Sequence, residues 1–203
     1  MIELHAWRTS NGLRARIALE ECGLPYVLRV VDITKGEQKS PAFLALNPAG
    51  KIPVLVDPDG PAGRTLTLLQ STAILLYCAE KTGRFLPPET ERPALMQALM
   101  SVGSDVTPNF SALLAMMRLP QPHAPSIELF RSRWDAYLEV WDRTLANQRY
   151  CLGDDLTIAD FSLFAAYAVP KLMFPELCAN SPNIDRFAEE IGARPGVRRA
   201  LAF

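Results

Sequence analysis

Hydrophobic and polar positions follow two different patterns along this chain of 203 residues, and the pattern changes before the midpoint. Residues 2–7 have strand character, and residues 10–22 carry apolar side chains at helical spacing. Gly23 and Pro25 end that helix, because glycine accepts a left-handed backbone and proline forbids a further turn. Residues 26–33 are rich in β-branched and aromatic side chains, which indicates a second strand. These residues predict a right-handed β-α-β unit with two parallel strands.

The following residues add a hairpin and two helices to this unit. The expected elements are a short helix at 41–46, strands at 52–56 and 65–69, and a helix at 72–81. The first of these two strands has Pro53 near its start, where the missing N–H of proline costs least. The predicted order of elements is β-α-β, then α, then β-β-α.

From residue 94 onward the pattern is helical, without the alternation that is typical of strands. The expected helices lie at 94–117, 126–148, 157–173, 183–192 and 195–202. Thr157 and Asp160 form a capping box at the start of one of them. Three prolines lie between Arg84 and Pro93 and mark a linker. We therefore predict an α/β domain over 1–83, a linker over 84–93 and an all-helical domain over 94–203.

Composition and charge exclude several function classes. The chain is 49% hydrophobic and 21% charged, as is usual for a globular protein, and its pI is about 6.1. A chain without basic excess is not expected to bind nucleic acid. Its longest nearly apolar run, at 161–170, is too short to span a bilayer, so no membrane partner is expected. Four scattered cysteines with no Cys-x-x-Cys pair predict no metal site. Free cysteines and the lack of a secretory signal pattern predict a cytoplasmic location.

A cluster of polar residues at the first helix start is a candidate site. Thr9, Ser10 and Asn11 lie where the first strand ends and the helix begins. A helix start offers unpaired N–H groups and the positive end of the helix dipole, which suit an anion such as a thiolate. The alternative is that Ser10 or Asn11 only caps the helix.

Further along, three more positions are candidates. The Ile52-Pro53 peptide bond can be cis, and the backbone before a cis proline can pair with a peptide ligand; the alternative is an ordinary trans proline. Gln70 and Ser71 form another polar helix start that can bind a carboxylate, or Ser71 only caps that helix. Gln38 lies in a charged loop and by itself indicates no more than a solvated residue.

The order of these signals resembles the cytosolic glutathione transferase superfamily over essentially the whole chain. The matching motifs are Asn-Pro-x-Gly-Lys-Ile-Pro-Val-Leu at 47–55, Leu-Leu-Gln-Ser-Thr-Ala-Ile at 68–74 and Leu-Gly-Asp-Asp-Leu-Thr-Ile-Ala-Asp-Phe at 152–161. The resemblance implies a thioredoxin-like N-terminal domain that binds glutathione, followed by an all-α C-terminal domain. Residues 9–21 and 35–41 look most like the bacterial nu class.

The resemblance also implies roles for the candidate residues. Thr9 and Asn11 match positions that face the glutathione sulfur, with Ser10 as a lesser candidate. Gln38 matches a contact to the glycyl end, the Ile52-Pro53 step matches a cis-proline contact to the cysteinyl unit, and Gln70-Ser71 matches the pair that holds the γ-glutamyl group. Ser10, Gln70 and Leu129 depart from the nu-class pattern, which has proline, glutamate and arginine at these places.

The expected function is that of a glutathione-dependent transferase in which glutathione is a co-substrate and no metal takes part. The enzyme would conjugate glutathione to an electrophile, or use it to reduce a disulfide or a peroxide. The nu-class likeness favours reduction. The alternatives are a non-catalytic protein-interaction module of the same fold and a ligand carrier. The resemblance further implies a homodimer.

Overall fold

The computed structural model describes residues 1–202, and the chain forms two compact units. The first unit contains residues 1–86 and the last stretch of the chain from Arg194 onward. The second unit contains residues 87–193. The sequence placed residues 195–202 in the helical domain, whereas the contacts group them with the first unit.

The first unit is built on a four-stranded sheet with the strand order β2-β1-β3-β4. The strands are β1 (Ile2–Ala6), β2 (Tyr26–Val30), β3 (Val54–Asp57) and β4 (Leu66–Leu69). β1 pairs in parallel with β2 and antiparallel with β3, and β3 forms a hairpin with β4. The predicted parallel pair and hairpin are confirmed. β3 begins at Val54 rather than at Ile52, because Pro53 has no N–H to donate to a ladder.

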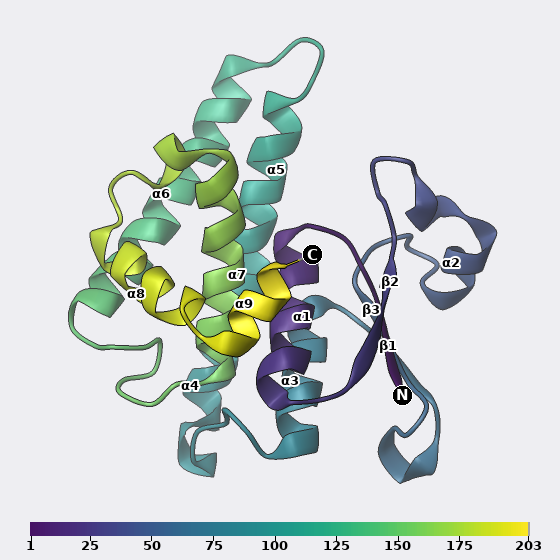
Figure 1. The fold of residues 1–203 in the computed structure, drawn as a ribbon. Coiled ribbons are helices and arrows are strands. Elements are labelled where there is room, and N and C mark those ends of the chain that lie inside the picture. Colours follow the sequence, from purple (N-terminus) through teal and green to yellow (C-terminus); the bar gives the residue numbers. More distant parts are fainter. Residues whose placement is uncertain (203) are drawn as a thin grey trace. The chain divides into compact units, whose positions relative to one another are not determined.

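Helices cover both faces of this sheet (Figure 1). The helices of this unit are α1 (Ser10–Cys22), α2 (Pro41–Leu46), α3 (Ser71–Thr82) and α9 (Pro195–Leu201), with 3₁₀ turns η1 (Glu37–Lys39) and η2 (Pro61–Gly63). Leu4 of β1 pairs with Leu55 of β3, both are fully buried, and alternation along β3 places them on the face opposite to Val54. On the other face, Phe43 of α2 packs against Val54 and Val31.

The C-terminal helix α9 packs against α1, although the two are far apart in sequence (Figure 1). Glu21 of α1 is buried and accepts hydrogen bonds from Nη2 of Arg194 (2.6 Å) and from the N–H of Val197 (3.2 Å). A Cβ at Gly196 would overlap this carboxylate, so the close approach requires glycine. A helical pattern alone does not indicate which other helix α9 packs against.

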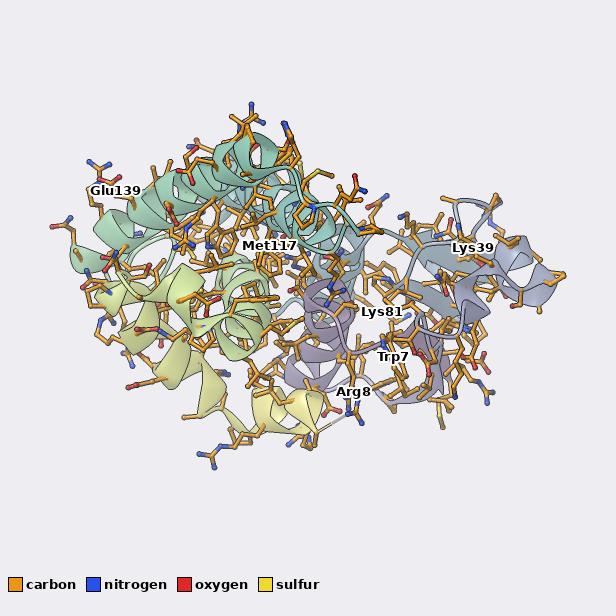
Figure 2. All side chains as sticks on the ribbon, turned by 90° about the horizontal axis from the view of Figure 1, so that it is seen from above. Trp7, Arg8, Lys39, Lys81, Met117 and Glu139 are labelled. Carbon is orange, nitrogen blue, oxygen red and sulfur yellow. The ribbon has the colours of Figure 1, made fainter. Side chains whose placement is uncertain are left out.

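The end of β3 is tied to α3 by the buried carboxylate of Asp57. Asp57 accepts a hydrogen bond from the hydroxyl of Tyr77 (2.6 Å) and forms an ion pair with Nζ of Lys81 (2.8 Å). Lys81 is labelled in Figure 2. Burial opposes ionisation of Asp57, but Lys81 and Tyr77 outweigh burial, so the pKa of this carboxyl is lowered.

We expect this carboxylate to make stability depend on acid pH. A lowered pKa in the folded state stabilises the protein above the unfolded pKa of about 4, and this contribution is lost as the pH falls through the folded value. Asp57→Asn should therefore be less stable than the wild type by about 1–2 kcal/mol at pH 7. Urea unfolding should show that gap closing below about pH 4. Asp59→Asn, which changes an exposed neighbour, is the control, and a gap that stays constant down to pH 3 would contradict the assignment.

The second unit is all-helical. It contains α4 (Arg92–Met100), α5 (Thr107–Met117), α6 (Ala124–Ala146), α7 (Ile158–Met173) and α8 (Pro182–Gly192), with 3₁₀ turns η3 (Glu89–Glu91) and η5 (Pro175–Cys178). The single helix predicted for 94–117 is divided by a π-helical segment, η4 (Ser101–Val106), which contains Gly103. Across residues 1–202, no helix combines the length and the apolar character needed to cross a bilayer.

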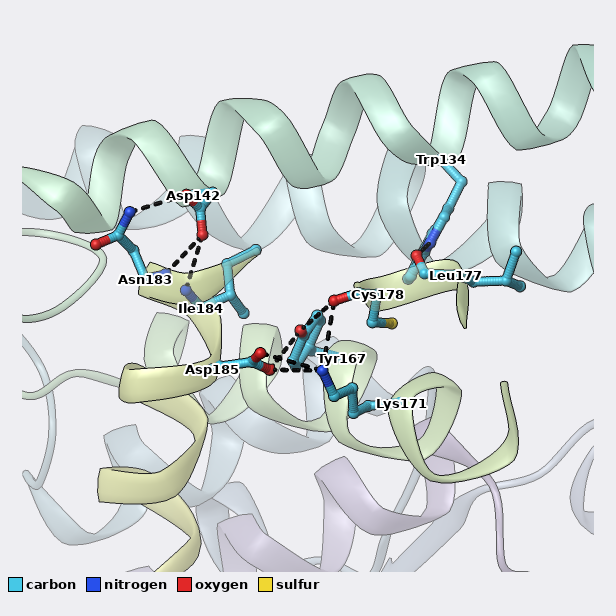
Figure 3. Close-up of polar contacts among 9 residues, drawn as sticks. All are labelled: Trp134, Asp142, Tyr167, Lys171, Leu177, Cys178, Asn183, Ile184 and Asp185. Atoms are coloured by element: carbon cyan, nitrogen blue, oxygen red, sulfur yellow. Dashed lines mark hydrogen bonds and ion pairs between the residues drawn. The ribbon is translucent and has the colours of Figure 1, made fainter. Parts of the chain in front are cut away.

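Polar contacts fix the helices of this unit to one another (Figure 3). Trp134 of α6 is fully buried, and its Nε1–H donates to the carbonyl of Leu177 (2.8 Å). Asp142 of α6 accepts from the backbone N–H groups of Asn183 (2.8 Å) and Ile184 (3.1 Å), which belong to the first turn of α8. α6 thereby caps α8 with a carboxylate, as the helix dipole favours.

A second cluster joins α7 to α8 (Figure 3). The Tyr167 hydroxyl donates to Asp185 (2.7 Å), and Lys171 lies 3.0 Å from the same carboxylate. Burial and the bond to Asp185 raise the pKa of Tyr167, so its hydroxyl stays protonated and acts as a donor. By contrast, Glu139 and Arg143 pair on the exposed face of α6, where Glu139 is labelled in Figure 2. These half-buried clusters stabilise this unit, whereas an exposed pair contributes little.

The predicted capping box at the start of α7 is present. Asp160 is fully buried, and its carboxylate accepts from the N–H groups of Thr157 (2.7 Å) and Cys151 (2.7 Å). The Thr157 hydroxyl accepts from the N–H of Ala159 (3.3 Å). Asp160 therefore holds both the start of α7 and the loop before it.

Candidate functional site

Three of the predicted polar clusters meet at one edge of the four-stranded sheet. His5 pairs with Val54, and Val54 pairs with Leu69, so the end of β1, the start of β3 and the end of β4 lie side by side. The residues that follow or precede these ends are Thr9, Ser10 and Asn11, then Ile52 and Pro53, then Gln70 and Ser71. The strand register therefore places residues that are sixty positions apart at a common edge.

Thr9 is the cap of α1, so the prediction that Ser10 or Asn11 caps this helix is wrong. Thr9 has an extended backbone, and its Oγ1 accepts from the N–H of Gly12 (3.1 Å). Its O–H remains able to donate. The first turn lies tightly against the preceding chain, because a Cβ at Gly12 would overlap the carbonyl oxygen of Trp7.

Ser71 does not cap α3 as predicted, because it is the first residue of that helix and Gln70 precedes it. The Ser71 side chain is buried, and its hydroxyl turns inward, where it donates to Oδ1 of Asn11 (3.2 Å). Its backbone N–H is one of the first-turn donors that a helix leaves unpaired. Gln70 has a φ of 70°, a backbone conformation that non-glycine residues rarely adopt and that clusters at functional sites.

The Ile52-Pro53 peptide bond is cis, so the alternative of an ordinary trans proline is wrong. The ladder between β1 and β3 starts at His5 and Val54. The backbone of Ile52 therefore lies before the paired part of β3, next to the ends of β1 and β4.

Gln38 lies on η1, close to the turn at Gly50 that precedes Ile52. Its backbone approaches Gly50, where an added Cβ would lie 3.0 Å from the Gln38 carbonyl oxygen. Among residues 1–202, the buried side-chain oxygen of Gln38 has no hydrogen-bond partner. Gln38 is thus half-buried with its side-chain oxygen covered by the protein, and it is not only a solvated residue.

The edge carries positive electrostatic potential. The first turns of both α1 and α3 begin here, and neither contains an acidic residue. Arg14 of α1 is buried beneath them and donates to Asn11 (2.8 Å) and Ser71 (2.7 Å). Burial lowers the pKa of Arg14 to about 10, so the guanidinium is still charged at neutral pH. Two helix starts and a buried cation together favour an anionic ligand.

Sequence reasoning missed Arg14. It follows Asn11 by three positions, so the two side chains lie on one face of α1. An arginine between Leu13 and Ala15, on the apolar part of the helix, was the signal that could have indicated it.

The protein's own thiols are not activated. All four cysteines are buried, and burial raises the pKa of each of them, for Cys178 to about 12. A reactive cysteine needs a lowered pKa and access to its target. Within the part of the chain that the structure describes, there is no group of three His, Cys, Asp or Glu side chains that could hold a metal ion.

Comparisons with known proteins identify the family. Residues 10–81 match the family model "Glutathione S-transferase, N-terminal domain", and residues 111–202 match "Glutathione S-transferase, C-terminal domain". The disulfide-bond oxidoreductase YfcG of Escherichia coli is 36% identical over 208 residues, which cover 99% of this chain and 94% of that protein. The chain belongs to the glutathione S-transferase family.

Solved structures agree with this assignment. A glutathione transferase family member from Pseudomonas fluorescens, with two glutathione bound, has a TM-score of 0.91 and 31% identity over 98% of this chain and 92% of its own. A glutathione transferase from Pseudomonas putida, with one glutathione disulfide bound per subunit, has a TM-score of 0.88 and 28% identity over 98% and 90% of the two chains. The predicted fold class, a thioredoxin-like domain followed by an all-α domain, is confirmed.

Proposed function

We propose that this chain is a glutathione-dependent enzyme that binds glutathione at the sheet edge and stabilises its thiolate. The observation that carries the proposal is the meeting of two helix starts over the buried network of Asn11, Arg14 and Ser71. A free thiol has a pKa of about 8.5, and each unit of lowering requires about 1.4 kcal/mol of preference for the thiolate. The hydroxyl of Thr9 and the side-chain amide of Asn11 supply charge-assisted hydrogen bonds of that size. Ser10 is a lesser candidate.

The other site residues hold the tripeptide in this proposal. The unpaired backbone of Ile52, beside Pro53, binds the cysteinyl unit in the manner of an added strand. The first-turn N–H of Ser71 and the side chain of Gln70 bind the γ-glutamyl end, because a carboxylate suits a helix start. The side chain of Gln38 binds the glycyl end.

We further propose that the acceptor is a disulfide. The glutathione thiolate attacks one sulfur of the substrate disulfide, which forms a mixed disulfide and releases one thiolate. A second glutathione attacks the mixed disulfide, which yields glutathione disulfide and the second thiol of the substrate. Both electrons come from two glutathione molecules, so four buried cysteines are no obstacle. The E. coli relative named as a disulfide-bond oxidoreductase and the P. putida structure with glutathione disulfide support this choice.

Calorimetric titration of the purified chain with reduced and then with oxidised glutathione tests the proposal. Tight binding of the oxidised form supports disulfide reduction, whereas preference for the reduced form supports conjugation to an electrophile. Gln70→Ala removes the side chain proposed for the γ-glutamyl end and should weaken binding about ten-fold. Thr67→Ala, an exposed change on β4, should leave binding unchanged. Binding of neither form at millimolar ligand would overturn the proposal in favour of a non-catalytic module.

Three further points remain predictions: the subclass, the oligomeric state and the cellular location. The nu-class likeness and the cytoplasmic location stay predictions. Homodimer formation also stays a prediction, and sedimentation of the purified chain measures it.

A further inference from the structure

The side chains of Arg14, Asn11 and Ser71 form a closed triangle beneath the site. A single nitrogen of the Arg14 guanidinium, Nη1, donates to Oδ1 of Asn11 (2.8 Å) and to Oγ of Ser71 (2.7 Å). The Ser71 hydroxyl closes the triangle by donating to the same Oδ1 (3.2 Å). Arg14 is only 1% exposed, so this triangle lies inside the unit while Asn11 itself is partly exposed.

The chemistry of these groups determines how the Asn11 amide is turned. A guanidinium has donors and no acceptor, so the Asn11 atom that faces Arg14 must be the carbonyl oxygen. That oxygen has two lone pairs, and the bonds from Arg14 and Ser71 use both of them. The amide nitrogen, Nδ2, therefore points away from the triangle with two N–H donors.

The same bonds restrict Ser71. Its oxygen accepts from Arg14, and its only hydroxyl hydrogen goes to Asn11. The hydroxyl therefore has no proton left for a ligand carboxylate. Ser71 can therefore bind a ligand carboxylate through its backbone N–H alone.

We propose that Arg14 is a positioning residue that keeps the Nδ2–H donors of Asn11 directed at the thiolate of bound glutathione. This inference rests on the proposed function and names a residue on which the sulfur contact depends. An amide without Arg14 can rotate by half a turn and present its oxygen, an acceptor that repels a thiolate. Donors that are held in place before the reaction stabilise the developing charge more than donors that must reorient.

The test is the thiol pKa of bound glutathione, measured from the ultraviolet absorbance of the thiolate as a function of pH. Arg14→Met keeps the apolar bulk of the side chain and removes the donors. We expect the bound thiol pKa to rise by about one pH unit, which is a ten-fold fall in the acid dissociation constant of the thiol. Arg16→Met is the matched control, because Arg16 is also buried in α1 but bonds to Tyr26 and to the carbonyl of Arg199. Arg16→Met should leave the bound thiol pKa unchanged.

A double-mutant cycle separates orientation from charge. If Arg14 acts through Asn11, Arg14→Met should cause no further rise of the thiol pKa in an Asn11→Ala background. If Arg14 acts only through its charge, the rise should be the same in both backgrounds, and the inference is overturned. Arg14→Lys retains a group that only donates, so it should restore most of the wild-type thiol pKa.

A measurement on the unaltered side chains covers the case in which Arg14→Met does not fold. With ¹⁵N-labelled asparagine, the Nδ2 resonance of Asn11 is identified by its loss in Asn11→Ala, and reduced glutathione should shift it. A wild-type chain that lowers the thiol pKa of bound glutathione without shifting this resonance would overturn the inference alone. A wild-type chain that binds no glutathione would overturn the proposed function as well.

Discussion

Replacing Asp160 by alanine is expected to lower the free energy of unfolding by about 3 kcal/mol, because it leaves two buried N–H groups without an acceptor. Those N–H groups belong to Thr157 and Cys151, and each lies 2.7 Å from the carboxylate. Burial raises the pKa of Asp160, since the backbone donors offset the loss of water only in part. The expected loss therefore comes from the orphaned donors and from the start of α7 rather than from the missing charge.

Urea unfolding at pH 7 measures this effect, with Asp155→Ala as the control. Asp155 lies in the same loop and is exposed, so its removal should change the free energy of unfolding by less than about 0.5 kcal/mol. Asp160→Asn retains one acceptor oxygen and should lie between the wild type and Asp160→Ala. Equal stabilities of Asp160→Ala and Asp155→Ala would show that the capping box contributes nothing.

The second large effect is on turnover. The double variant Thr9→Ala with Asn11→Ala should turn over glutathione-dependent substrates at least ten times more slowly, because it removes both side-chain donors proposed for the thiolate. The bound thiol should also titrate at higher pH, so the pH at which activity rises should increase. Steady-state kinetics with a disulfide substrate, over a range of pH, measures both changes.

The controls for this variant separate the sulfur contacts from the helix cap. Thr9→Ser retains the hydroxyl that caps α1 and should keep most of the activity, whereas Thr9→Ala also loses the cap. Ser10→Ala lies in the same turn and should change turnover less than either proposed donor. Unchanged turnover in the double variant would refute the assignment of Thr9 and Asn11 as the sulfur partners.

Local patterns in the sequence predicted most of the elements. The 41–46 helix and the Thr157-Asp160 capping box depend on residues a few positions apart, and the structure has both. Turn residues and apolar spacing also predicted the β3–β4 hairpin. Such features are visible in sequence because each is stabilised by groups within one turn or one strand pair.

Features that depend on distant residues could not be predicted. The hydroxyl of Ser71 turns inward because Asn11 and Arg14, about sixty positions earlier, accept and donate there. A helix-start serine without such partners would be expected to act as a cap. Local sequence holds no record of which buried group lies beneath a helix start, so the inward turn of the Ser71 hydroxyl and the role of Arg14 emerged only from the structure.

The bond between Glu21 and α9 has a consequence for the order in which the chain is made on the ribosome. Glu21 leaves the ribosome early, whereas Arg194 and Val197, its partners, are made after the whole of residues 87–193. At typical synthesis rates this interval lasts on the order of 10 seconds. During that time the nascent glutathione-binding unit has its sheet and α1 but lacks α9. The first unit to be translated is therefore the last to be completed, and a fragment that stops at residue 86 would remain at that incomplete stage.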